Sequence, residues 1–230
     1  MKVVVIHGQN HKGSTYNIAD ILAHKVSDEV TEFMLPKDLP DFCLGCTTCF
    51  IKGEDKCPHR EYTEKIINAI DEADLIILAS PVYVFHASSP MKNLLDHMSF
   101  RWMPHRPEAS MFKKQAVAIS TAAGSGMKST NKDMVDSLFF WGVAKIYKLG
   151  FAVRATSYEG ISEKRKKALL KKIDKIALKI KKKNGKVKPG FKLKFMFGIM
   201  RLFQKNGYNE RDINHWKDRG WLGKKRPWKK

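Results

Sequence analysis

The sequence lacks any long apolar segment. Its longest apolar stretch, residues 75–85, contains Ser80 and Pro81 and falls short of the roughly 20 apolar residues that a membrane-spanning helix requires. Residues 1–8 hold too few apolar side chains for a signal peptide and are typical of a first buried strand. We therefore expect no transmembrane helix and a cytoplasmic location.

Cysteine is scarce and confined to one segment. The chain has four cysteines, and all of them fall between Cys43 and Cys57. A structural disulfide framework would normally join distant segments in an oxidising compartment, and this clustering argues against one. Metal binding or redox chemistry is the expected role of the segment.

Acidic residues are scarce only in the C-terminal third. Residues 1–160 carry 18 Lys and Arg against 18 Asp and Glu, whereas residues 161–230 carry 25 against 5. The formal net charge of +20 therefore belongs entirely to the C-terminal part of the chain. This distribution removes overall basicity as an argument that the whole protein binds nucleic acid.

Apolar runs and helical patterns alternate along most of the chain. A protein of 230 residues can hold one α/β domain and an extension. Unbroken apolar runs are typical of strands that helices cover on both faces of a parallel sheet. We predict an α/β fold with a doubly wound, flavodoxin-like sheet of five parallel strands. The runs that predict these strands are 3–6, 30–35, 75–79, 117–119 and, more weakly, 152–156.

The predicted domain covers residues 1–183 and ends in a helix over 162–183. One face of this helix is nearly all lysine and is expected to be solvated. The Gly and Pro residues of 184–190 indicate a linker. Residues 184–230 are predicted to form a basic helical C-terminal extension that includes a helix over 192–205. The aliphatic stripe of the first helix consists of Leu169, Ile173, Ile176 and Ile180.

The loop after the first predicted strand suits a phosphate group. Ligands of open parallel sheets bind outside the carboxyl ends of the strands, and residues 8–17 form a polar loop at that edge. Free backbone N–H groups at the following helix start, with the hydroxyls of Ser14 and Thr15, would hold a phosphate. His11 or Lys12 would add positive charge. The alternative is that Ser14 or Thr15 only caps the helix.

The loops after the third and fourth predicted strands suit a flat ring. Residues 80–86 are apolar and aromatic, so they can pack along a planar ring system. Residues 120–126 are small, which lets backbone donors approach the edge of a ligand closely. We predict that the two loops hold the ring between them.

These segments together resemble the NADPH-dependent FMN reductase and iron–sulfur flavoprotein group of the flavodoxin-like superfamily, over about residues 1–160. The resemblance rests on Gly8 with Ser14 and Thr15, on Ser80-Pro81-Val82-Tyr83, on the helix 91–96 and on the run 121–126. It implies FMN as cofactor and NAD(P)H as co-substrate. Relatives often show Ser-Pro-Arg where this chain has Gln9-Asn10-His11, so individual phosphate contacts differ.

The resemblance also implies which residues contact FMN. Those expected around the phosphate are His11, Ser14, Thr15 and Tyr16. Those expected against the isoalloxazine ring are Pro81, Val82, Tyr83, Val84, Phe85, Thr121, Ala122, Ala123, Gly124 and Gly126.

The cysteine motif predicts a 4Fe-4S cluster held by Cys43, Cys46, Cys49 and Cys57. Two-residue gaps let successive thiolates point at one small group, and a fourth cysteine followed by Pro58 is typical of bacterial ferredoxins. The segment follows the second strand, which neighbours the first, so the cluster would lie at the same rim as the flavin. There it would exchange single electrons with a group that accepts hydride as a pair.

Two alternatives for the cysteines stay open from the sequence. Zinc would take four thiolates, or three together with His59, although structural zinc sites more often pair two knuckles across a longer insert. The cysteines would otherwise hold no metal and act as small buried residues or as a reversible thiol pair.

The expected function is an FMN-dependent oxidoreductase that moves electrons from NAD(P)H or a reduced carrier to an unidentified acceptor. No general acid or base is assigned, and His86, His97 and His105 are interpreted as packing or surface residues. The alternative is a non-enzymatic flavin-binding sensor, or a protein that associates with nucleic acid or membrane through its basic extension.

The apolar residues of 191–203, flanked by Lys and Arg, must be covered by something. A homo-oligomer partner or the chain's own core is the first expectation, and anionic lipid under a basic amphipathic helix is the second. The same charge would steer an acidic redox partner such as ferredoxin. Nucleic acid is not an expected partner, because the tryptophans of the tail permit base stacking without requiring it.

Overall fold

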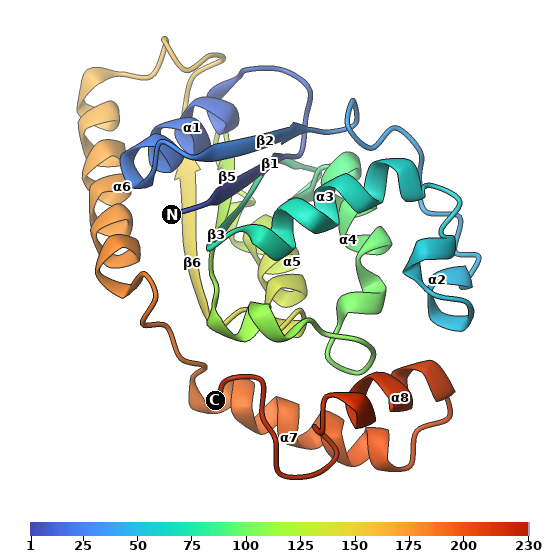
Figure 1. Ribbon diagram of the computed structural model, residues 1–230. Coiled ribbons are helices and arrows are strands. Elements are labelled where there is room, and N and C mark those ends of the chain that lie inside the picture. Colours follow the sequence, from blue (N-terminus) through green and yellow to red (C-terminus); the bar gives the residue numbers. More distant parts are fainter. Residues whose placement is uncertain (230) are drawn as a thin grey trace.

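A five-stranded parallel sheet forms the centre of the computed structural model, which describes residues 1–229 (Figure 1). The strand order is β2-β1-β3-β5-β6, which confirms the predicted doubly wound α/β fold. The parallel strands are β1 (Val3–His7), β2 (Val30–Met34), β3 (Leu75–Tyr83), β5 (Gln115–Ala122) and β6 (Lys145–Ala152).

Two features of the sheet differ from the prediction. The predicted strand at 152–156 is wrong, because β6 occupies Lys145–Ala152. In this edge strand, buried residues alternate with exposed or half-buried ones, so the sequence shows no continuous apolar run. A two-residue strand, β4 (His86–Ala87), also pairs antiparallel with the end of β3.

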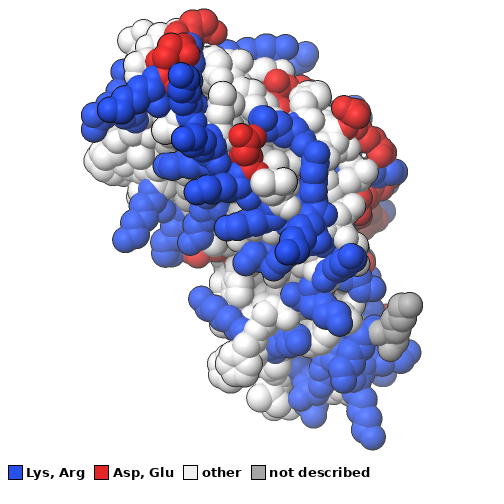
Figure 2. All heavy atoms as spheres, turned by 90° about the vertical axis from the view of Figure 1, so that its left-hand side faces the viewer, with Lys and Arg blue, Asp and Glu red and all other residues white. Residues whose placement is uncertain are grey.

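Helices cover both faces of the sheet, as the apolar runs predicted. On one face, α1 (Ser14–Val26) and α6 (Glu163–Lys183) pack on the odd-numbered side chains of β1. The lysines of α6 gather on the surface, and Figure 2 shows basic side chains dominating that face of the molecule. The predicted stripe of α6 is confirmed, with Leu169, Ile173 and Ile180 buried. The other face carries α3 (Arg60–Glu72), α4 (Ser89–His97) and α5 (Met127–Phe140).

The C-terminal extension forms a third, smaller core. Its helices α7 (Phe191–Lys205) and α8 (Glu210–Asp218) lie together beyond the sheet (Figure 1). They pack on η3 (Ala109–Lys113), a short element that precedes β5, and on Met103 in the chain between it and η2 (Ser99–Arg101). Within residues 1–229, no helix has the length and apolar character needed to cross a bilayer. The buried residues of the small core are Met103, Phe112, Leu193, Phe197, Trp216 and Trp221.

Candidate functional site

The three predicted loops meet at the carboxyl ends of the strands. The Thr15 and Thr121 hydroxyl oxygens lie 2.6 Å apart in a buried hydrogen bond between the first and third of these loops. The Tyr83 hydroxyl donates to Gln9 Oε1 at 3.2 Å and connects the second loop to the first. The structure therefore brings together loops that are up to 106 residues apart in sequence.

The N-terminus of α1 has free backbone donors. Its N-cap is Gly13, and no side chain accepts a hydrogen bond from the first turn. The first N–H with a helical acceptor is that of Asn17, which donates to the Gly13 carbonyl at 3.1 Å. Since Thr15 is bonded to Thr121 instead, the structure gives no support to the reading that Thr15 or Ser14 caps the helix. The N–H groups of residues 14–16 remain available to an anion.

Of the residues expected around the phosphate, His11 is exposed and Tyr16 is largely buried. The exposed His11 lies close to Gly13, beside the helix start. The Tyr16 ring packs on His7, with 4.6 Å between ring centroids, and its hydroxyl donates to Glu32 at 3.4 Å. Burial and the Glu32 charge raise the pKa of Tyr16. Tyr16 thus offers the helix start its backbone N–H, while its side chain is engaged with β1 and β2.

The loop after β3 presents apolar side chains to solvent. Val84 is 93% exposed and Phe85 is 61% exposed, and both have positive φ angles, of 49° and 64°. Because β-branched and aromatic residues rarely adopt this conformation, the loop is strained in a way that is common at ligand sites. Gly126 lies behind it with φ of 95°, and a Cβ there would come within 2.5 Å of Val82. Among the small residues predicted after β5, Gly126 is therefore needed for this close approach.

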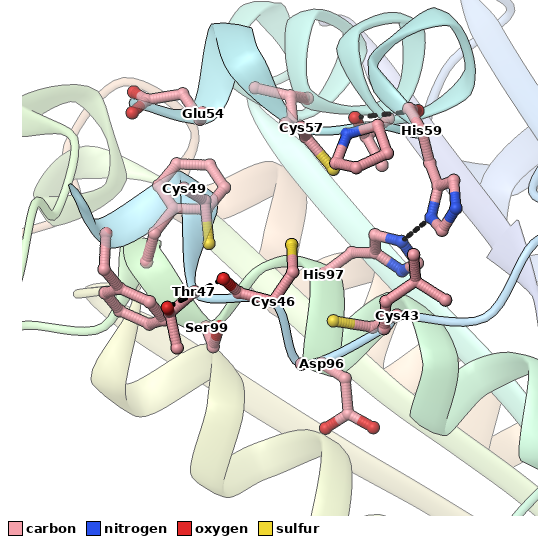
Figure 3. Close-up of a pocket in the computed structure, with 17 residues that line it drawn as sticks. Cys43, Cys46, Thr47, Cys49, Glu54, Cys57, His59, Asp96, His97 and Ser99 are labelled. Carbon is pink, nitrogen blue, oxygen red and sulfur yellow. Dashed lines mark hydrogen bonds between the residues drawn. The ribbon is translucent and has the colours of Figure 1, made fainter. Parts of the chain in front are cut away.

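All four cysteines line one cavity (Figure 3). Their sulfur atoms face a common space between the loop that follows β2 and the end of α4. None of the four forms a disulfide. The cavity measures about 90 Å³, far less than the roughly 300–1,000 Å³ of sites for drug-sized ligands. A compact inorganic group fits this space, and a tricyclic ring does not.

The thiols influence one another electrostatically. Burial, with the charges of Cys57 and Cys43, raises the pKa of Cys49 to about 11. Burial also raises the pKa of Cys57, whereas hydrogen bonds with Thr48 lower that of the exposed Cys46. Each ionised sulfur opposes ionisation of the next, so all four would ionise together only with a cation among them.

Two histidines border the cysteines. Ligand atoms of Cys57, His59 and His97 all lie within 4.8 Å of one another. The His97 Nδ1–H donates to the Asn93 carbonyl at 3.0 Å, so in neutral His97 the Nε2 atom accepts from His59 Nδ1 at 3.0 Å. Burial lowers the pKa of His97 and favours this neutral form. His97 is buried, in keeping with its interpretation as a packing residue, and its ring also lines the cavity.

Helix α4 holds the start of the cysteine loop through Asn93. The buried Asn93 accepts from the Cys43 N–H at 2.9 Å and donates to the Asp41 carbonyl at 2.8 Å. Gly45 has a φ of 63°, which turns the chain between Cys43 and Cys46 without the strain that a side chain would add. The first two thiols are thus positioned by one buried amide and one turn.

Arg106 connects the cysteine loop to the C-terminal extension. Its guanidinium is 8% exposed and donates both to the main-chain carbonyl of Cys49 and to the Asp212 carboxylate. Asp212 is 2% exposed and also accepts from His105 Nδ1 at 2.8 Å. His105 is therefore a partner in a buried polar network and no longer an isolated histidine.

Helix α8 makes further contacts with α2 (Thr48–Ile51), which carries Cys49. The Asn209 side chain caps α8 by accepting from the Arg211 and Asp212 N–H groups, and its Nδ2 donates to the Phe50 carbonyl at 3.2 Å. Arg211 donates to the Lys52 carbonyl. We call the set Arg106, Asn209, Arg211 and Asp212 the clasp, because it holds the part of the cysteine loop around α2, whereas Asn93 holds its start.

A comparison with family models decides what kind of protein has this architecture. The model of the NADPH-dependent FMN reductase family matches residues 1–156. The chain belongs to this FMN reductase family. Membership confirms the resemblance and makes the protein an FMN reductase-like oxidoreductase, and it supports FMN and NAD(P)H as its cofactors. The C-terminal extension lies outside the matched residues.

Relatives within and around the FMN reductase family agree with this assignment. The chain is 28% identical over 159 residues to an iron-sulfur flavoprotein of Archaeoglobus fulgidus, and the aligned residues make up 66% of this chain and 70% of that protein. It is 34% identical over 137 residues to an iron-sulfur flavoprotein of Methanocaldococcus jannaschii, and the aligned residues make up 56% of this chain and 67% of that protein. The NAD(P)H:quinone oxidoreductase of Methanothermobacter marburgensis shares the fold, with a TM-score of 0.61 and 13% sequence identity. The superposition covers 77% of this chain and 95% of that one.

Proposed function

We propose that this FMN reductase family member passes electrons from NAD(P)H, or from a reduced carrier, through FMN to a 4Fe-4S cluster held by Cys43, Cys46, Cys49 and Cys57. The observation that carries the proposal is the convergence of four free thiols on one small cavity (Figure 3). The names of the two flavoprotein relatives support it. The zinc alternative has less support, because the nearest mixed set takes only Cys57 from the four cysteines and adds His59 and His97.

The rim formed by the three loops is the proposed FMN site. The free N–H groups at the start of α1, with His11, Ser14 and Thr15, would hold the phosphate. The exposed apolar segment 81–85 and the small residues 121–124 and 126 would contact the ring. When bound, FMN accepts hydride as an electron pair and can release electrons one at a time. The chain's role is to orient the ring and to leave one face open to the donor.

Helix α4 connects the two sites. At its N-cap, the Ser88 hydroxyl donates to the Gly8 carbonyl at 2.5 Å, and the Ser88 N–H donates to Ser80 Oγ at 2.9 Å. Five residues later, Asn93 holds Cys43. Five helical residues rise only about 7.5 Å. One rigid helix therefore contacts both the phosphate loop and the cysteine loop, which supports direct electron exchange between the groups they hold.

The test is anaerobic purification of the full chain, followed by absorption spectroscopy and iron analysis. We expect flavin bands, a broad shoulder that bleaches on reduction, and about four irons per chain. Cys49→Ser should lose the shoulder and the iron but keep FMN and oxidation of NAD(P)H by FMN. Leu44→Ser, in the same loop but without loss of a thiol, is the control. Stoichiometric zinc or a metal-free, fully active protein would refute the cluster, and protein that cannot be reconstituted with FMN would refute the flavin site.

We also propose a homo-oligomer and an acidic acceptor such as a ferredoxin as partners. Val84 and Phe85 expose apolar surface beside the rim, which a second copy would cover. The basic C-terminal third would attract an acidic carrier. Sedimentation of Val84→Ser against the natural chain tests the first proposal, and the ionic-strength dependence of electron transfer to a ferredoxin tests the second.

A further inference from the structure

One face of α7 remains unpartnered after the extension has folded. Exposed apolar residues four and seven positions apart share one face of this helix, and a further one lies beside them in the last turn. The buried side chains Leu193 and Phe197 lie on the opposite face, in the small core. The four residues of the α7 stripe and their exposed fractions are Phe191 at 84%, Phe195 at 59%, Leu202 at 58% and Phe203 at 64%.

The segment that carries the stripe is basic and has no acidic residue. Between residues 175 and 209 the sequence has 11 Lys and Arg and no Asp or Glu. Lys192, Lys194 and Lys205 are exposed on α7 itself. Figure 2 shows uncharged atoms bordered by Lys and Arg in the lower part of the molecule, at the height where Figure 1 places α7. Exposed apolar rows within such a field of cations are uncommon on a monomer surface.

We propose that the α7 stripe docks this protein on an anionic lipid bilayer. Phenylalanine and leucine side chains would enter the boundary between headgroups and acyl chains, while the flanking lysines meet the lipid phosphates. α7 would lie in the plane of the membrane, since it is too short and too charged to span it.

Two other occupants fit the surface less well. A second copy of the chain would bring the same basic residues against one another, because residues 175–209 hold no acidic side chain to pair with them. Nucleic acid would favour aromatic rings that can stack on bases, whereas the stripe includes the aliphatic Leu202. Phe191 and Phe195 already stack on each other, with ring centroids 6.1 Å apart.

The experiment is co-sedimentation of the full-length protein with vesicles of phosphatidylcholine alone and of phosphatidylcholine mixed with phosphatidylglycerol. We expect binding to the mixed vesicles, weakened by salt, and little binding to the neutral ones. Phe195→Gln and Leu202→Gln should each weaken binding about tenfold, because each removes apolar area from the lipid contact. Leu178→Gln is the matched control, since Leu178 is 68% exposed on α6, outside the stripe.

Circular dichroism of each variant provides the folding check, and these exposed positions should leave the unfolding midpoint unchanged. The proposal is overturned if the natural chain ignores anionic vesicles. It is also overturned if the stripe variants bind as well as Leu178→Gln, because lysine charge alone would then account for binding. Self-association of the natural chain that the stripe variants abolish, without vesicle binding, would assign the stripe to a second copy instead.

Discussion

The buried ion pair between Arg106 and Asp212 allows a sharp test of the clasp. Asp212→Asn keeps the size of the side chain but removes its charge, leaving the guanidinium of Arg106 buried at 8% exposure without its main counter-ion. Breaking a buried pair in this way costs about 3–5 kcal/mol of unfolding free energy. Arg106 retains the Cys49 carbonyl and, at 3.3 Å, Glu54. We therefore expect a loss of about 3 kcal/mol, at the lower end of that range.

Urea unfolding followed by tryptophan fluorescence measures this loss, because Trp216 and Trp221 are buried in the small core beside Asp212. Asp218→Asn, at an exposed position on the same helix, is the matched control and should change stability by less than about 0.5 kcal/mol. Iron release to a chelator should also accelerate in Asp212→Asn only. If Asp212→Asn and Asp218→Asn behave alike in both assays, the clasp does not hold the cysteine loop.

Three further predictions concern single positions. Burial, with the Arg219 charge, lowers the pKa of His215 from 6.5 to about 4. As the pH falls, the unfolded chain therefore binds a proton at His215 before the folded chain does, so the stabilisation is full above pH 6.5 and falls by up to about 3 kcal/mol toward pH 4. His215→Gln should reduce this loss of stability in acid, measured by urea unfolding at a series of pH values. Asn93→Ala leaves the Cys43 N–H without its acceptor, so we expect a loss of about 2–3 kcal/mol and lower iron content than in the natural chain. Gly126→Ala adds a Cβ where φ is 95° and Val82 is too close, so thermal melting should show a loss of about 1–3 kcal/mol, whereas Gly124→Ala, with open space around it, should not.

Local sequence patterns predicted most of the sheet and named the residues of both proposed sites. Apolar runs predicted four of the five parallel strands, and those of β1, β3 and β5 are buried almost throughout. This pattern failed at β6, where the buried Tyr147, Leu149 and Phe151 alternate with exposed or half-buried residues and leave no apolar run. The cysteine spacing likewise places four thiols within reach of one small group, because two-residue gaps leave little freedom in the chain between them.

The tertiary structure alone decided how these parts are held. Arg106 and Asp212 are 106 residues apart, and neither lies in a motif that announces a partner. Asn93 was part of a recognised helix, yet its role appears only where α4 passes the cysteine loop. His97 looked isolated in sequence and lines the cavity in space. Sequence periodicity reports which side of an element is buried, but contacts between distant segments depend on how the elements pack, and only the folded chain contains that information.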